Sequence, residues 1–153
     1  MVDLWAGIGG LCLALLALGV HIYAISAESD PDARAASQAT MPNLVHIDSV
    51  EAIQGVDLRP FLQRRQVRGI ILGGGSPCQG NSSLNRGRKG LRDPRSQQPS
   101  HLQRIRDEIM ALPEAGHCEI ITFLENVASM PQTVCDQYSA WLGTQPVLID
   151  AAG

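Results

Sequence analysis

The sequence has few aromatic residues, no close pair of cysteines and no long apolar run. Aromatic residues make up only 4% of the 153 residues, so a core must be built mainly from Leu, Ile, Val and Ala, which suits strands buried between helices. The cysteines at 12, 78, 118 and 135 form no CxxC pair, and no His lies close to two of them. Neither a metal site nor a disulfide framework is indicated, and free thiols indicate a reducing compartment.

The longest apolar run, residues 11–20, is too short to span a membrane. Asp3 stands where a signal peptide would need positive charge, so we expect a soluble, intracellular protein. With 44% apolar residues, a chain of this length fits one globular domain over residues 1–153.

Positive charge is concentrated in one segment. Residues 59–106 contain eleven of the twelve Lys and Arg residues but only one of the fifteen acids, Asp93. This segment therefore carries +10 and the rest of the chain carries −13. Such a separation indicates a polyanionic partner, with a solvated surface loop as the alternative.

Short β-type runs alternate with helix-type runs along the chain. Strands are predicted at residues 2–6, 21–27, 44–47, 69–72, 119–124 and 146–149. Helices are predicted at residues 11–18, 31–40, 57–66, 101–112 and 131–142. This alternation favours an α/β fold with a doubly wound, mainly parallel sheet. The polar tract at residues 76–100 predicts a long binding loop or lid without a packed element.

Ligands of doubly wound folds bind beyond the carboxyl ends of the strands. The first predicted strand ends in Asp3-Leu4-Trp5-Ala6-Gly7-Ile8-Gly9-Gly10, where glycines allow close approach of a ligand and Trp5 offers a flat face for a purine. A nucleotide-like cofactor is indicated, and a turn with Trp5 in the core is the alternative. Cys12 replaces a glycine of the dinucleotide fingerprint, which argues against NAD.

Acids follow the next two predicted strands. Glu28 is placed to accept hydrogen bonds from ribose hydroxyls. Asp48 is placed to accept from an adenine amino group, although the start of a helix is the commoner reason for an Asp there.

Two further strand ends can carry covalent and proton-transfer chemistry. Cys78, in Gly75-Ser76-Pro77-Cys78-Gln79, opens the basic loop, where positive charge favours the reactive thiolate form. A small, inert buried cysteine is the alternative, and for a lone Cys it is the commoner case. Glu125, in Glu125-Asn126-Val127, follows an apolar strand whose walls would let a carboxyl hold a proton, unless Glu125 and Asn126 simply form a cap.

Five motifs thus follow one another: residues 3–10, Glu28, Asp48, Pro77-Cys78-Gln79 and Glu125-Asn126-Val127. In this order and at these separations they resemble the first, second, third, fourth and sixth motifs of cytosine-5 DNA methyltransferases. Residues 88–91 and 146–151 are further similar to the animal de novo branch, although Gln79 is the commoner family residue. The resemblance covers nearly the whole chain.

The resemblance implies a Rossmann-like fold that binds S-adenosylmethionine and releases S-adenosylhomocysteine. Trp5 would pack against this cofactor, Glu28 would bind its ribose, and Asp48 with Ser49 would lie near its adenine. The implied cofactor-binding residues are Asp3, Trp5, Ala6, Gly7, Gly9, Gly10, Glu28, Ser29, Asp48, Ser49 and Pro77.

The implied reaction is methylation of carbon 5 of a cytosine that is flipped out of DNA. Cys78 would attack carbon 6 while Glu125 protonates ring nitrogen 3, and loss of the carbon 5 proton would expel Cys78. The implied catalytic residues are Cys78, Glu125, Pro77 and Asn126. A mobile loop at residues 80–95 would close over DNA, and the implied DNA contacts are Gln79, Ser82, Arg86, Arg88, Lys89 and Arg92.

The sequence departs from the family pattern at Ser29, where a bulky residue is common, and at residues 96–102, which lack the fifth motif, so weakened cofactor binding is expected. The chain also ends at Gly153, before the eighth motif, the target recognition region and the last two motifs. We therefore expect a partial catalytic domain, incomplete at the C-terminus, with little activity alone. A complementing subunit or C-terminal half is the expected partner, and the exposed sheet edge allows a homo-oligomer.

Two alternatives stay open beside a DNA methyltransferase, which would work in the nucleus of a eukaryote or the cytoplasm of a bacterium. One is a catalytically silent relative that binds and regulates an active partner, against which the presence of both Cys78 and Glu125 argues. The other is transfer to cytosine in transfer RNA.

Overall fold

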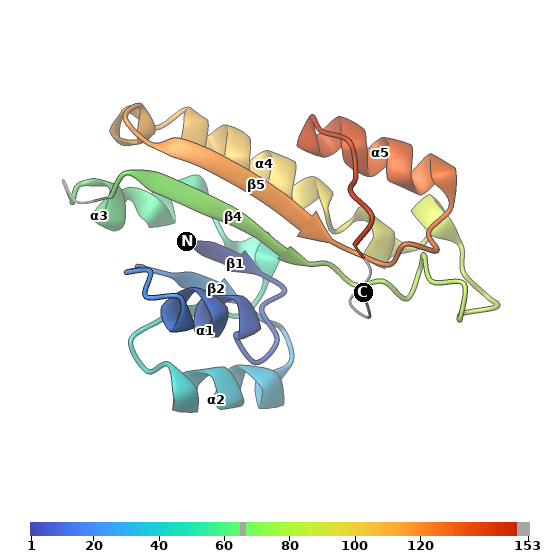
Figure 1. Cartoon of the computed structure of the whole chain (residues 1–153), viewed down its shortest axis with the longest axis horizontal. Coiled ribbons are helices and arrows are strands. Elements are labelled where there is room, and N and C mark those ends of the chain that lie inside the picture. Colours follow the sequence, from blue (N-terminus) through green and yellow to red (C-terminus); the bar gives the residue numbers. More distant parts are fainter. Residues whose placement is uncertain (65–66, 150–153) are drawn as a thin grey trace.

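The computed structural model describes residues 1–64 and 67–149, and its centre is a sheet of five parallel strands. The strands lie in the order β3-β2-β1-β4-β5, so the direction of winding reverses between β1 and β4 (Figure 1). They are β1 (Val2–Leu4), β2 (Ile25–Ala27), β3 (Val45–Ile47), β4 (Gly69–Gly75) and β5 (Glu119–Glu125). The predicted doubly wound α/β sheet is confirmed.

Helices flank the sheet, with α1 and α2 beside β1 to β3 and α4 and α5 beside β4 and β5 (Figure 1). The α-helices are α1 (Gly10–Ala17), α2 (Pro31–Thr40), α3 (Arg59–Leu62), α4 (Ser100–Met110) and α5 (Gln132–Leu142). The 3₁₀ helices are η1 (Val50–Ala52), η2 (Gly55–Leu58), η3 (Gly90–Arg92), η4 (Pro94–Gln97) and η5 (Pro113–Ala115). Across the described part of the chain, no helix is long and apolar enough to cross a bilayer.

The main core lies between the sheet and α4. Ile105 and Ile109, one turn apart on α4, are fully buried and belong to the same apolar cluster as Leu4 and Leu72 on the neighbouring strands β1 and β4. A smaller cluster joins Cys12 of α1 to the α2 side of the sheet. The core is aliphatic, as the low aromatic content predicts.

Three local predictions are wrong. Residues 146–149 form no strand, because β5 is not paired with them and a strand is stable only beside a partner; Asp150 and Ala151 lie outside the described residues. The helix predicted at 57–66 is divided into η2 and the short α3, since Pro60 fits only the first turn of an α-helix; Gln66 lies outside the described residues. The tract at 76–100 contains η3 and η4, and it buries the polar side chains of Asn81 and Ser96 as well as Pro99.

One apolar surface is left open beside the outermost strand. β5 is at the edge of the sheet, and Ile121 in its middle is 54% exposed. Leu16 on α1 is 47% exposed, so α1 also carries apolar side chains that the described residues do not cover. This edge matches the exposed edge strand that the sequence predicts.

The glycines of β4 let it lie very close to both neighbouring strands. A Cβ at Gly73 would collide with the Phe123 carbonyl oxygen of β5, and a Cβ at Gly74 would collide with the Leu4 carbonyl oxygen of β1. Because both obstacles are backbone atoms of a sheet, they cannot move aside as a flexible side chain could.

We therefore expect Gly74→Ala to lower the free energy of unfolding by roughly 2–4 kcal/mol, because β1 and β4 must separate to admit the methyl group. Urea unfolding measures this loss. Gly87→Ala is the matched control, since the nearest atom to a Cβ there is at 3.5 Å, and it should leave the stability nearly unchanged. Equal unfolding midpoints for the two variants would contradict the close strand packing.

Candidate active site

The ends of β4 and β5 bring the predicted nucleophile and the predicted proton carrier to the same edge of the sheet. Gly75 is in register with Glu125, and the Ser76 N–H donates to the Glu125 carbonyl oxygen at 3.2 Å. Glu125 Oε2 lies where a side chain on Gly75 would stand, 2.8 Å from an ideal Cβ position. The Glu125 side chain is exposed, so the apolar enclosure expected around it is not formed by the described residues.

Asn126 fastens this junction. Its Nδ2 donates to Ser76 Oγ at 2.8 Å and to the Ser76 carbonyl oxygen at 3.2 Å, while its Oδ1 accepts from the Val127 N–H at 2.9 Å. Ser76 is itself buried and directly precedes Pro77-Cys78. The amide of Asn126 therefore fixes the entry to the Cys78 turn against the end of β5, which goes beyond a cap for its own backbone.

Cys78 is half-buried at the start of a tight turn. Its carbonyl oxygen accepts from the N–H groups of Asn81 at 2.9 Å and Ser82 at 2.8 Å, so the chain folds back immediately after the thiol. Pro77 removes backbone freedom on the other side of the thiol. Two of the other cysteines lie elsewhere: Cys12 is a buried residue of α1, and burial raises the pKa of the Cys118 thiol, just before β5.

The Glu28 carboxylate connects the second strand end to the glycine-rich turn. Oε2 accepts from the Gly7 N–H at 2.7 Å, and Oε1 accepts from the Asp30 N–H at 2.8 Å. Gly7 has a φ of +54°, which glycine adopts without strain. Glu28 thus joins the glycine-rich turn to the segment after β2 at the carboxyl edge of the sheet.

The N-terminus of α1 offers space and unpaired donors beside Glu28. Its cap residue, Gly9, supplies no side-chain hydrogen bond, and a Cβ at either Gly7 or Gly10 would meet no atom within 4 Å. Free N–H groups at a helix N-terminus attract a carboxylate or another anion. The turn is therefore open where an amino-acid carboxylate could approach, which fits S-adenosylmethionine. Gly9 itself packs against Met41 at the end of α2.

Trp5 packs against the core, as one of the two interpretations of the sequence predicts, and its role as a stacking face for a cofactor stays a prediction. It is partly buried and packs against the main core, and it adopts a φ of +54°, which is uncommon for a residue with a side chain. Its Nε1 donates to Gln98 Oε1 at 3.2 Å, and Gln98 Nε2 donates to Glu51 Oε1 at 2.7 Å. This chain of hydrogen bonds fixes the orientation of the indole at the carboxyl edge.

The predicted adenine side of the site is less constrained. The Asp48 side chain is 88% exposed and pairs with Arg34 Nη1 at 3.0 Å, so its carboxylate is partly neutralised. Ser49 begins η1 and contributes to a lowered pKa of Glu51, whose main cause is the hydrogen bond from Gln98. Ser29 is exposed, in keeping with the open cofactor pocket expected from its small size.

Asp3 lies beneath the glycine-rich turn. Only 2% of the residue is exposed, and the Cys12 thiol donates to Oδ2 at 3.6 Å. Burial raises the pKa of Asp3 to about 7, and burial also raises the pKa of Cys12 to about 12. Asp3 therefore lies buried beneath the turn with Cys12 as its partner, and its role in cofactor binding stays a prediction.

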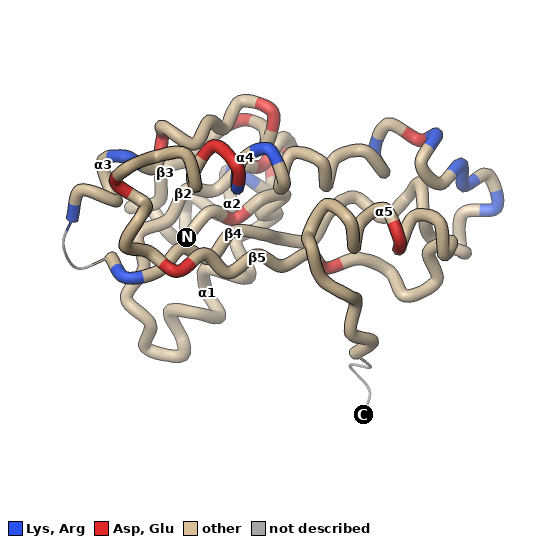
Figure 2. Tube along the Cα trace, turned by 90° about the horizontal axis from the view of Figure 1, so that it is seen from above, with Lys and Arg blue, Asp and Glu red and all other residues tan. Residues whose placement is uncertain are grey.

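The basic loop projects from the end of the molecule beside α5, where its Lys and Arg residues gather (Figure 2). Arg86, Lys89 and Arg92 are exposed there, as phosphate contacts require. Arg88 instead donates from Nη1 to the carbonyl oxygens of Ser129 at 2.7 Å and Asn81 at 3.1 Å. The loop is therefore attached to the segment that follows β5.

Two of the other predicted DNA contacts differ in exposure. Gln79 is exposed, and its carbonyl oxygen accepts from Asn85 Nδ2 at 2.7 Å. Ser82 is buried, and its hydroxyl accepts from the Leu84 N–H at 3.3 Å. Within the described residues, no group of three or more His, Cys, Asp or Glu side chains could hold a metal ion.

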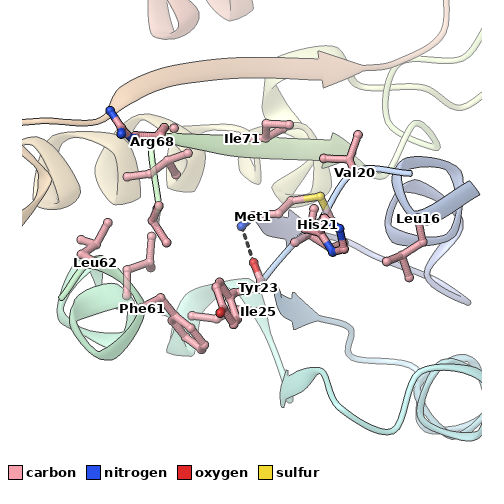
Figure 3. A pocket seen from close by; sticks show the side chains of 15 residues that line it. Met1, Leu16, Val20, His21, Tyr23, Ile25, Phe61, Leu62, Arg68 and Ile71 are labelled. Carbon is pink, nitrogen blue, oxygen red and sulfur yellow. Dashed lines mark hydrogen bonds between the residues drawn. The ribbon is translucent and has the colours of Figure 1, made fainter. Parts of the chain in front are cut away.

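A hollow of about 600 Å³ lies at the opposite edge of the sheet, at the amino ends of β2 and β4 (Figure 3). Its lining is mainly apolar, and the Met1 ammonium group donates to the Tyr23 carbonyl oxygen at 2.6 Å within it. None of the residues that the sequence indicates for catalysis or cofactor binding lines this hollow. The hollow is therefore separate from the predicted site.

A family model for C-5 cytosine-specific DNA methylases matches residues 1–133, which include all five motifs. The chain belongs to this family. For the C-5 cytosine-specific DNA methylases, an S-adenosylmethionine-type methyl donor and a DNA substrate are implied. A search of curated proteins gave no match.

Solved structures support the fold of this family member. A prophage-encoded E. coli protein assigned as a DNA modification methyltransferase is 23% identical with a TM-score of 0.63, and 93% of this chain covers 37% of it. The methyltransferase EhMeth of Entamoeba histolytica is 18% identical with a TM-score of 0.65, and 92% of this chain covers 42% of it. The methylase chain thus spans about two fifths of the length of these structures.

Some side chains that build the site were missed in the sequence. Gln98, which holds Trp5, and Ser76, which receives Asn126, lie outside the residues that the motifs select. Asn81 and Ser96 were placed in a loop without packing, yet both are fully buried. Of these residues, only Asn81 could have been found from the sequence. It stands three residues after Cys78, where a tight turn favours a polar residue.

Because the pKa of Asp3 is raised, the free energy of unfolding of this chain should depend on pH. Between about pH 4 and pH 7 the unfolded chain has lost the Asp3 proton while the folded chain keeps it, so stability falls as pH rises. Relative to Asp3→Asn, which is neutral throughout, the wild type should lose roughly 3–4 kcal/mol over this range.

Chemical denaturation at several pH values measures this difference. Asp32→Asn, on the exposed face of α2, is the control and should follow the wild-type curve. If the Asp3→Asn and wild-type curves run parallel from pH 4 to pH 7, Asp3 is not held neutral by burial.

Proposed function

We propose that this chain carries the nucleophile and the cofactor-binding turn of an enzyme that methylates carbon 5 of cytosine in DNA. The single observation that carries the proposal is the junction at the ends of β4 and β5. There, strand register sets Gly75 opposite Glu125, and the Asn126 amide holds Ser76, which directly precedes Pro77-Cys78, in a chain of the C-5 cytosine-specific DNA methylase family.

The two side chains supply complementary chemistry. The Cys78 thiolate forms a bond to carbon 6 of the cytosine, while the Glu125 carboxyl holds a proton at ring nitrogen 3 and so takes up the charge that the addition places on the ring. The electron pair moves to carbon 5, which becomes nucleophilic. When the proton on carbon 5 is later lost, the double bond re-forms and the bond between Cys78 and carbon 6 breaks.

S-adenosylmethionine would supply the methyl group when bound. The residues that would hold it are the Gly7–Gly10 turn, with its open space and uncapped helix N-terminus, Glu28 for the ribose and the Trp5 indole as a stacking face. Asp48 and Ser49 would border the adenine. Pro77 would lie between the cofactor and the cytosine.

DNA is the proposed substrate because the charge of the surface agrees with the family. The exposed Arg86, Lys89 and Arg92 lie on the same loop as Cys78 and can contact phosphates on either side of a flipped base (Figure 2). Arg88 would act differently: its internal hydrogen bonds shape the loop, and only its remaining donors are available to DNA. An enzyme that acts on DNA works inside the cell.

We further propose that turnover requires the parts of the matched structures that this chain does not span. The chain spans about two fifths of the matched structures, and the open β5 edge with its exposed Ile121 is a surface on which further strands and helices can dock. Target recognition and full cofactor affinity would come from those parts. Alternatively, two copies of this chain could associate through the same edge of β5.

An oligonucleotide with 5-fluorocytosine at the target position tests the proposal, because fluorine cannot leave as a proton does and the Cys78 adduct is trapped. With S-adenosylmethionine and the C-terminal half of a full-length homologue supplied, we expect a stable protein–DNA adduct. Cys78→Ser should reduce the adduct by more than about a hundredfold, because a serine hydroxyl is a far weaker nucleophile at neutral pH.

Cys118→Ser is the matched control, since Cys118 lies at the opposite end of β5, and it should leave the adduct intact. An adduct that survives Cys78→Ser overturns the assignment of the nucleophile. A labelled RNA that is trapped in preference to DNA supports the transfer RNA alternative instead. Absence of any adduct, together with stimulation of another methyltransferase, supports the silent regulatory alternative.

A further inference from the structure

A closed ring of buried hydrogen bonds lies behind the Cys78 turn. Asn81 Nδ2 donates to Tyr138 Oη at 2.8 Å, Tyr138 Oη donates to the Ser96 carbonyl oxygen at 3.1 Å, and Ser96 Oγ donates to Asn81 Oδ1 at 2.7 Å. Asn81 and Ser96 are fully buried, and Tyr138 is 4% exposed. Burial raises the pKa of the Tyr138 hydroxyl, which keeps it a neutral donor.

The ring joins three segments that are distant in sequence. Asn81 lies in the turn after Cys78, Ser96 lies in η4 at the far end of the basic loop, and Tyr138 lies on α5. Two glycines make this junction possible: a Cβ at Gly80 would collide with Ser96 Oγ, and Gly90, with a φ of +55°, lies against Val134 of α5. The Gly90 N–H also donates to the Gly80 carbonyl oxygen at 2.9 Å.

The ring is connected to the thiol through the backbone. The Asn81 N–H donates to the Cys78 carbonyl oxygen, so the position of Asn81 fixes the peptide that carries the thiol. On the other side of Asn81, its carbonyl oxygen accepts from Arg88, which is also bonded to Ser129 after β5. The side chain, the N–H and the carbonyl oxygen of Asn81 are thus all engaged.

Such a ring of hydrogen bonds favours one conformation of the turn after Cys78. Buried polar groups without partners are costly, so an alternative path for the turn would have to leave the amide of Asn81 or the hydroxyl of Tyr138 unpaired. An apolar contact at the same place would permit small shifts, whereas hydrogen bonds at fixed distances and angles do not. This ring of oriented hydrogen bonds therefore lies directly behind the turn that carries Cys78.

We propose that Asn81, Ser96 and Tyr138 are positioning residues that hold Cys78 in its reactive orientation, so that α5 supports the nucleophile turn. The inference rests on the proposed function for its catalytic consequence. The mechanical part, that the ring fixes the surroundings of the Cys78 thiol, does not depend on which substrate the thiol attacks. The two parts can therefore be tested separately.

The test measures the alkylation of individual cysteines by iodoacetamide in the folded chain, with peptide mass spectrometry to separate Cys78 from Cys12. Tyr138→Phe removes one hydroxyl from the ring and keeps the aromatic ring, which is stacked on Trp141 at 5.7 Å. We expect Cys78 to be alkylated roughly tenfold faster, because the turn opens locally. The buried Cys12, on the far side of the sheet, should be alkylated at the wild-type rate.

Cys12 separates a positioning role from a structural one. If Tyr138→Phe only destabilises the fold, both cysteines become reactive together, and the proposal is overturned. It is also overturned if neither rate changes. Ser139→Ala, the next residue on α5, is the matched control and should change neither rate, and Ser96→Ala replaces Tyr138→Phe if the latter does not fold.

Trapping on DNA that contains 5-fluorocytosine tests the catalytic part of the proposal. Tyr138→Phe should form the adduct more slowly although its thiol is more accessible to iodoacetamide, and Ser139→Ala should form it at the wild-type rate. A wild-type chain that forms no adduct overturns the proposed function, while the alkylation result still decides whether the ring holds the turn. An unchanged adduct rate in Tyr138→Phe, with alkylation accelerated, overturns the link between the ring and catalysis.

Discussion

The close approach of β4 to β1 and β5 is the constraint on which the rest of the structure depends. Glycines at 73 and 74 leave no room for a side chain between the strands, so the three backbones pair at the distance that hydrogen bonding prefers. This pairing sets Gly75 opposite Glu125 and delivers the residues after β4 to the end of β5. Without this pairing, the segments that carry Cys78 and Glu125 would not meet at the same edge of the sheet.

Polar contacts then hold the chain where the sheet ends. Asn126 fastens Ser76 at one side of the nucleophile, and the ring of Asn81, Ser96 and Tyr138 fastens the turn at the other. Glu28 and the Gln98–Trp5 pair do the same for the glycine-rich turn. These hydrogen bonds orient the carboxyl edge, and the charged tip of the basic loop, with Arg86 and Lys89 exposed, is available to a polyanion.

The sequence predicts the parallel sheet, the places of its five strands along the chain and the helix that begins at Pro31, because these depend on local periodicity, capping and glycine. The first strand ends earlier than predicted, at Leu4, and the fourth ends later, at Gly75. It does not predict the buried ring. Asn81 and Ser96 stand among Gly, Pro and Arg residues that indicate a solvated loop, and Tyr138 is fifty-seven residues from the amide it bonds. A polar side chain is buried when the fold brings it a hydrogen-bond partner from a distant segment, and no local sequence pattern indicates that partner. The strand expected at 146–149 failed for the opposite reason: its apolar pattern is present, but the described residues supply no neighbouring strand.

The most direct measurement is a crystal structure of the chain, completed by the missing part of the domain, trapped on a duplex that contains 5-fluorocytosine. We expect a bond from Cys78 Sγ to carbon 6 of a flipped cytosine, with the Glu125 carboxyl at about 3 Å from ring nitrogen 3. We also expect Gly75 to stay in register with Glu125. A cytosine bonded to another cysteine, or one held by Cys78 with Glu125 turned away to solvent, would contradict this expectation.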